Sequence, residues 1–210
     1  MIYDMRTYIL KPGSMAAVQA IYEKSLPVRG KYSQVGAFFR SEIGTLNQLV
    51  HIWPYDDLDH MERARAEASA DPSGLWPPPG LMDYIVSMES DLLRPLSFMK
   101  DWDGPQKLGN IYELRIYSLL PGHTPDVIKT WTEKIPARLE FSPIAGCWVP
   151  LSAGSKQNRL YHLWPYEDFA DRVEKRAAST ASGKWPPDKG QHYTHQESRL
   201  LVPFSFSLLH

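Results

Sequence analysis

The chain consists of two copies of one unit, and this repeat restricts its fold more than any other feature of the sequence. The segment YDMRTY at Tyr3–Tyr8 returns as YELRIY at Tyr112–Tyr117, and HIWPYDD at His51–Asp57 returns as HLWPYED at His162–Asp168. All matched motifs keep their order, with offsets of 108 to 111 residues, which indicates a duplication. We place the first unit at residues 1–99, a polar linker at 100–109 and the second unit at 110–210.

Each unit has the pattern strand, helix, strand, strand, helix, strand. Alternating residues rich in Tyr, Ile and Thr predict strands, and apolar residues spaced three and four apart predict helices. This order indicates an α+β class, with a layer of helices on one side of a sheet. In the first unit the predicted elements are strand Ile2–Leu10, a helix from Met15 through Tyr22, strands Val35–Glu42 and Leu49–Trp53, helix Asp56–Ala70 and strand Met88–Arg94.

Chemically useful side chains share one face of the strands, because residues two apart point the same way. The other face, with Tyr3 and Met5, suits packing under the helices. We therefore expect the polar face to line a cavity between two facing sheets. Its members in the first unit are Asp4, Arg6, Tyr8, His51 and Trp53, and in the second Glu113, Arg115, Tyr117, His162 and Trp164.

The candidate catalytic residues are Arg6, His51 and Glu42. Arg6 would clamp an anion with its forked guanidinium, and His51 would transfer a proton near neutral pH. Glu42 is a candidate general base, although it also suits an ordinary pair with Arg40 on the same strand face. The second unit has no glutamate there, because residues 151–156 read LSAGSK. The candidate substrate-binding residues are Asp4, Tyr8, Trp53, Arg115, Tyr117, His162 and Trp164.

A structural alternative explains the same residues. Arg6 can pair with Asp4 or Glu89, because buried charges need partners, and His51 can donate to a carbonyl group. In that case the polar residues form a sealed network in a non-catalytic binding or scaffold protein. The two hypotheses differ in whether free volume lies beside Arg6 and His51.

Other motifs have stronger structural than catalytic explanations. His192, His195 and Glu197 look like metal ligands, but residues three apart on a strand face opposite ways. Nothing marks His51 or His162 as a haem ligand, so we expect neither a metal nor a cofactor. The remaining expectations are an anchoring or lid role for the proline-rich loops after Trp76 and Trp185, a buried inert Cys147, and solvated helix faces for Arg65 and Arg176.

Three segments of the first unit resemble the NIPSNAP family: Tyr3–Gly13, Ser41–Tyr55 and Glu89–Pro95. The second unit shares the outer motifs. The resemblance implies two tandem ferredoxin-like (β-α-β-β-α-β) units that form a dimeric α/β-barrel-type arrangement, closed within one chain or between chains, and we expect a homodimer in either case. The wider superfamily includes cofactor-free oxygenases, isomerases and haem enzymes, which is an analogy of fold only.

The composition of the chain argues against nucleic acid and membranes as partners. A net charge of −1 provides no basic surface for nucleic acid. No apolar run approaches the ~20 residues of a membrane span, and the start lacks the pattern of a signal peptide. One cysteine fits a reducing compartment, so we expect a cytoplasmic protein. The predicted function is a small-molecule pocket inside the barrel that supports cofactor-independent acid/base chemistry of isomerase, lyase or oxygenase type.

Overall fold

A computed structural model describes residues 1–151, 156–187 and 191–210. Residues 152–155, where the second copy departs from the Glu42 region of the first, lie outside the described residues. The first unit comprises β1 Ile2–Leu10, α1 Met15–Arg29, β2 Ala37–Ile43, β3 Gln48–Tyr55, α2 Leu58–Ser69, the 3-10 turn η1 Leu81–Tyr84 and β4 Ile85–Pro95. The second comprises β5 Ile111–Leu119, α3 Thr124–Leu139, β6 Gly146–Pro150, β7 Arg159–Tyr166, α4 Phe169–Ala181 and β8 Tyr193–Pro203.

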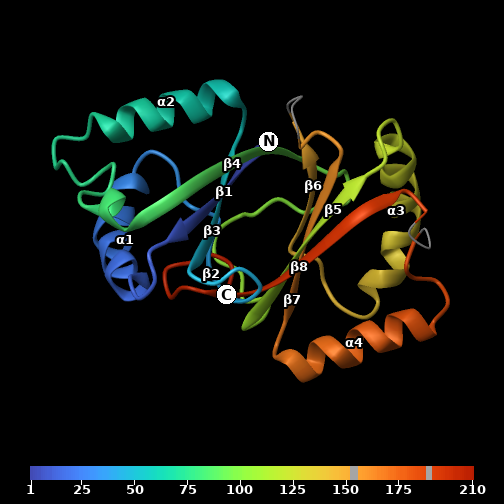
Figure 1. Ribbon diagram of the computed structural model, residues 1–210. Helices are drawn as coiled ribbons and strands as arrows, with labels where there is room; N and C mark the ends of the chain where they lie inside the picture. Colours follow the sequence, from blue (N-terminus) through green and yellow to red (C-terminus); the bar gives the residue numbers. More distant parts are fainter. Residues whose placement is uncertain (152–155, 188–190) are drawn as a thin grey trace.

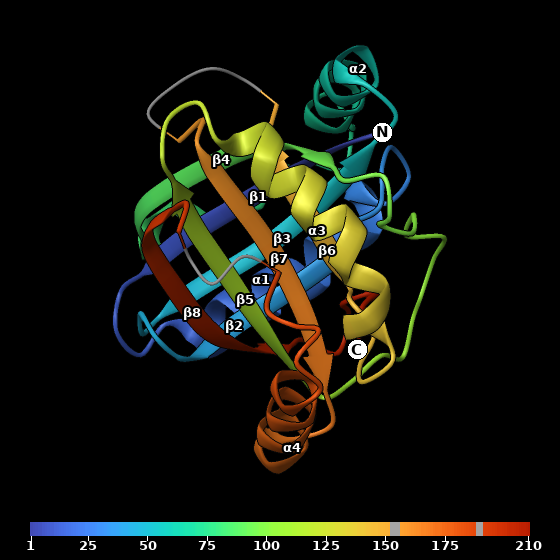
Figure 2. The same cartoon turned by 90° about the vertical axis from the view of Figure 1, so that its right-hand side faces the viewer.

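The strands form one closed barrel within the chain, in the order β1-β3-β2-β8-β5-β7-β6-β4. Each unit contributes four neighbouring strands, and the fourth strand of each unit pairs with the second strand of the other. Thus β2 pairs with β8 and β4 pairs with β6, both antiparallel. The helices lie outside the barrel, those of the first unit on one side and those of the second on the other (Figure 1). The turned view shows α3 in front of the strands of its own unit (Figure 2).

The predicted elements agree closely with the structure. In the first unit, the first strand has the predicted bounds, and the other strands and the second helix differ by one to three residues at their ends. The first helix extends beyond the predicted Tyr22 to Arg29. An aspartate caps the start of the second helix of each unit: Asp57 accepts a hydrogen bond from the backbone N–H of His60, and Asp168 from that of Asp171. Such a cap satisfies an N–H that has no partner within the helix.

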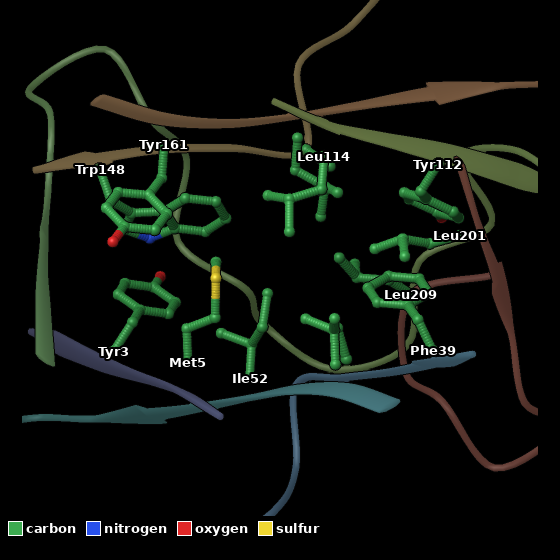
Figure 3. Packing of buried hydrophobic residues seen from close by; sticks show 14 of the residues in the cluster. Tyr3, Met5, Phe39, Ile52, Tyr112, Leu114, Trp148, Tyr161, Leu201 and Leu209 are labelled. Carbon is green, nitrogen blue, oxygen red and sulfur yellow. The ribbon is translucent and has the colours of Figure 1, made fainter. Parts of the chain in front are cut away.

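The inside of the barrel is an apolar core that includes residues from all eight strands. Tyr3, Met5 and Ile52 point towards Trp148 and Leu114 from the opposite strands (Figure 3). The expected assignment of strand faces was therefore wrong: this face lines the barrel, and the face with Asp4, Arg6 and Tyr8 lies under the helices. The interior of an eight-stranded barrel can be narrow enough for its own side chains to fill it, and here the less charged face supplies the apolar side chains that pack inside.

The segment between the units also packs against this core. Trp102 contacts the rings of Tyr3 and Trp148, with centroids 5.3 and 5.7 Å away, and its indole N–H donates to the carbonyl oxygen of Ala145 at 2.7 Å. A Cβ on Gly36 would lie 2.4 Å from the Trp102 ring. Met99 and Leu108 are likewise partly buried against the core. The segment therefore helps to fill the barrel as well as joining the units.

Candidate functional site

The first unit holds a cleft between the outer face of its strands and its helices. Its volume is about 310 Å³. The predicted polar residues meet there, because β1 and β3 pair with Asp4 opposite Trp53 and Arg6 opposite His51. Helix α1, helix α2 and the Trp76 loop supply the remaining walls. The lining residues are Asp4, Arg6, Tyr8, Tyr22, Arg29, His51, Trp53, Tyr55, Arg65, Ser69, Trp76, Pro77, Pro78, Leu81, Met82 and Met88.

Asp4 is the only acid among the described residues of this lining, and it is 1% exposed. Its carboxylate accepts hydrogen bonds from the guanidinium of Arg65 on α2 and from the hydroxyl of Ser90 on β4. The Nε of Arg6 lies 3.5 Å from the same carboxylate. Glu89 bonds to Lys156 instead. A buried carboxylate needs such partners, since a charge without them is costly in a low-dielectric site.

His51 is neutral and has a defined tautomer. Its Nδ1 lies 2.6 Å from the indole Nε1 of Trp53. Because an indole N–H can only donate, Nδ1 must be the acceptor and the ring proton must sit on Nε2. That Nε2 is buried and has no hydrogen-bond partner. Burial, and then the charge of Arg6, lowers the pKa of His51 well below its ordinary value, so the ring is a hydrogen-bond donor near neutral pH.

Arg29 places a second guanidinium in the wall of this cleft. It is 2% exposed and donates to the hydroxyl of Tyr55 at 2.9 Å. Its charged end lies 4.8 Å from the ring centre of Trp53 and 5.6 Å from that of Trp76. The two indole rings are 5.9 Å apart. Aromatic faces attract a cation at such distances, so Arg29 connects the strand wall to the proline-rich loop.

The second unit has the same site. Its cleft has a volume of about 330 Å³. The indole of Trp164 donates to Nδ1 of His162 at 2.6 Å, and His162 Nε2 is buried without a partner. Arg138 donates to the hydroxyl of Tyr166 and lies 4.4 Å from the Trp164 ring. The lining residues are Arg115, Tyr117, Trp131, Arg138, His162, Trp164, Tyr166, Arg176, Ser179, Thr180, Trp185, Pro186, Pro187, Tyr193 and Gln196.

The buried acid of this second site is Glu113, which is 0% exposed. One carboxylate oxygen accepts from Arg172 at 2.7 Å and from Ser198 at 2.6 Å, and the other accepts from Arg176 at 3.2 Å. Arg115 is more distant, at 3.9 Å. These contacts hold the pKa of Glu113 below its usual value even though burial acts to raise it. Glu113 is therefore a charged partner for the arginines of α4.

Apart from Glu42, the predicted site residues lie in two separate clefts, one in each unit, rather than in one cavity between facing sheets. Glu42 is exposed at the end of β2 and pairs with Arg40 at 2.6 Å, outside both clefts. The expectation that Arg65 and Arg176 are solvated helix faces was wrong, since each binds a buried acid across the cleft. The residues that we did not select are Tyr22, Arg29 and Tyr55 in the first unit and their counterparts Trp131, Arg138 and Tyr166 in the second.

Among the described residues, one group could hold a metal ion. The ligand atoms of His123, Asp126 and His192 lie within 4.8 Å of one another on the surface, and the two imidazoles stack at 4.5 Å. His195 is not part of this group and lies 3.8 Å from Glu197. Cys147 is buried, as expected, and burial raises the pKa of its thiol well above the ordinary value. No described helix is long and apolar enough to cross a membrane.

Comparison with known proteins identifies both units. Residues 3–100 and 112–208 each match the family model named NIPSNAP. Human Protein NipSnap homolog 3B is 25% identical, over 99% of this chain and 85% of its own length. Protein NipSnap of Drosophila melanogaster is 27% identical, over 98% of this chain and 78% of its own. A solved structure from Lactobacillus acidophilus, of a protein proposed to be a monooxygenase, has a TM-score of 0.69 at 8% sequence identity. The match covers 96% of this chain and 93% of that chain. This similarity concerns the fold alone.

Proposed function

The chain belongs to the NIPSNAP family, and we propose that its two clefts bind small unsaturated organic acids. In each cleft the arginines attract the acid group, and the neutral histidine donates a hydrogen bond to an oxygen of the bound molecule. The sites lie on the outer face of the barrel, under the helices, rather than inside it.

The observation that carries this proposal is that the same arrangement occurs in both units. Each cleft combines volume for a small molecule with a buried arginine, paired indole rings and a histidine donor without a partner. A buried donor that lacks a partner costs free energy in the empty protein. A ligand oxygen would provide that partner, and the indole rings suit a flat, apolar ligand body.

The histidines favour an electrophilic role over that of a base. In His51 and His162, Nδ1 already accepts from an indole, and Nε2 carries the proton. Neither nitrogen is available to accept a proton from a substrate unless the indole bond breaks. A neutral imidazole N–H can still polarise a carbonyl group or stabilise an enolate. The chemistry that these histidines would support is therefore the stabilisation of negative charge that develops on a ligand oxygen.

The alternative function is that of a scaffold with sealed polar networks. The packing of His51 favours it, because Phe38 stacks on the imidazole at 4.8 Å and Tyr8 meets it edge-on at 4.7 Å. In this case the clefts would hold only water, and the two hypotheses differ in whether an organic anion binds.

The test is a calorimetric titration with 2-naphthoate and with its neutral analogue 2-naphthamide. We expect up to two naphthoate molecules per chain, at least tenfold weaker binding of the amide, and a similar loss of naphthoate affinity in the double variant Arg29→Gln/Arg138→Gln. The matched control is Arg40→Gln, which removes an exposed arginine that lines neither cleft. Equal binding of acid and amide, or no binding of either, would favour the scaffold.

The homodimer and the cytoplasmic location stay predictions, as do the exclusion of nucleic acid and the absence of a cofactor. Light scattering at several concentrations would measure the oligomeric state directly. If a homodimer forms, each assembly would carry four clefts.

A further inference from the structure

The two clefts differ in charge because one residue of the second helix differs between the units. Met61 on α2 is a buried member of an apolar cluster. The residue at the matching position of α4 is Arg172, three residues into the helix as in the first unit. Arg172 donates to the buried carboxylate of Glu113 at 2.7 Å. The first unit has no cation at this position, so among the described residues Asp4 forms ion pairs only with Arg65 and Arg6.

In the first unit, one carboxylate neutralises two arginines. Asp4 binds Arg65 directly and lies 3.5 Å from Arg6. Asp4 also lines the cleft itself, so a bound anion would meet a negative charge in the wall. Only Arg29 is left without a carboxylate partner, and it donates to Tyr55 and to the carbonyl oxygen of Ser33.

In the second unit, two helix arginines and Arg115 share one carboxylate, so this acid has three cationic partners where Asp4 has two. Arg172 and Arg176 take one oxygen each of Glu113. Arg115 is left at 3.9 Å, beyond hydrogen-bond reach. Arg138 donates only to neutral hydroxyls, those of Ser142 and Tyr166. The described lining of this cleft contains three arginines and no acid.

Two further observations agree with this difference. The pKa of His162 is lowered by burial and then by Arg115, Arg176 and Arg138, whereas only Arg6 adds to burial at His51. The histidine of the second unit therefore experiences a more positive surrounding. The wall of the second cleft is also more polar, since Gln196 lines it where Met88 lines the first.

From these contacts we infer that the second cleft selects a doubly charged organic anion, whereas the first accepts a singly charged one. The inference rests on the proposed function, because it concerns which acids the clefts bind. Arg115 and Arg138 are the cations that a second negative charge would neutralise. Arg172 acts as a positioning residue, since it donates directly to Glu113 and leaves Arg115 with only the longer, 3.9 Å ion pair to that acid.

The experiment is a calorimetric titration at low ionic strength with three probes. These are 2-naphthoate, 2,6-naphthalenedicarboxylate, in which two charges are separated, and 2-naphthyl phosphate, in which they share one group. We expect at least one dianion to bind with a stoichiometry of one per chain and at least tenfold more tightly than naphthoate binds to the same site. The Arg172→Met variant should lower that dianion affinity at least tenfold, while the weaker naphthoate site is unchanged.

The matched control is Arg63→Met, which removes the same charge from an exposed position of α2. If both dianions bind to two equal sites, or if Arg172→Met behaves like Arg63→Met, the inference is overturned and the proposed function stands. If no probe binds at all, the proposed function fails as well. The wild-type stoichiometry decides between one site and two even if Arg172→Met does not fold.

Discussion

His51 and His162 are the residues whose chemistry depends most on burial. Each is 2% exposed, and its pKa lies well below the ordinary value of 6.5. When the chain unfolds, both imidazoles return to water and regain that ordinary value. Below pH 6.5 the unfolded state therefore binds more protons than the folded state, so acid favours unfolding.

We predict that the free energy of unfolding levels off between about pH 7 and 8 and falls as the pH drops below 6.5. One such histidine contributes a slope of up to about 1.4 kcal/mol per pH unit, and two contribute about twice that. Urea unfolding at intervals from pH 7.5 to 5 measures this slope. His51→Gln should reduce it by about half. The pH range of this histidine effect is separate from that of Glu113, whose lowered pKa affects stability only at more acidic pH. A flat profile between pH 6.5 and 5 would contradict the assignment of neutral buried rings.

For individual residues, the sequence predicted which side chains form the clefts better than it predicted their chemical roles. The recurrence of Arg6, His51 and Trp53 in the second copy was enough to select them. The tautomer of His51 depends on a contact with Trp53 that only coordinates reveal. Arg29 recurs as Arg138 in matching x-Pro-x-Arg segments, and that signal would have found both buried arginines. We did not select Arg29 because the predicted helix ran only through Tyr22, and the structure extends it to Arg29.

The sequence predicted which strand residues share a face, but not which face turns into the barrel. Strand alternation shows which residues share a face, and β1 and β3 confirm those groups. It does not show which face turns inwards when both carry apolar residues. That choice follows from the closed barrel, whose interior excludes charges, and from the helices, which supply Arg65 and Arg176 as partners. The local pattern was therefore correct, and its orientation required the tertiary fold.

The second helix of each unit depends for its stability on the aspartate that precedes it. Asp57 caps α2 by accepting from the N–H of His60 at 2.7 Å. We predict that Asp57→Ala lowers the free energy of unfolding by about 1 kcal/mol, because that N–H loses its partner. Chemical denaturation measures the loss. The comparison variant is Asp59→Ala, which changes an exposed acid in the first turn and should cost only a few tenths of a kcal/mol through the helix dipole. Equal losses in the two variants would argue against the cap.

Across the whole molecule, the linker contributes to the core that it was expected only to connect. We predict that Trp102→Ala destabilises the protein by about 3 kcal/mol, the usual cost of truncating a large aromatic side chain in a core. Its contacts with Tyr3 and Trp148 and its bond to Ala145 would all be lost. Thermal and urea unfolding measure this effect. Trp102→Phe should recover part of the loss, since a ring remains, and a neutral Trp102→Ala would mean that the segment is a passive connector.

The barrel and the clefts leave different freedom for change between the two halves. Inside the barrel, the ring centre of Phe39 lies 4.8 Å from that of Tyr112 in the other half. A substitution that changes the size of one of these side chains therefore requires a compensating substitution in the other half. Each cleft is lined from one half only. After duplication, the halves can therefore diverge in specificity while they keep a common frame. The chain resembles a heterodimer of paralogues whose one-to-one ratio is fixed by a covalent bond.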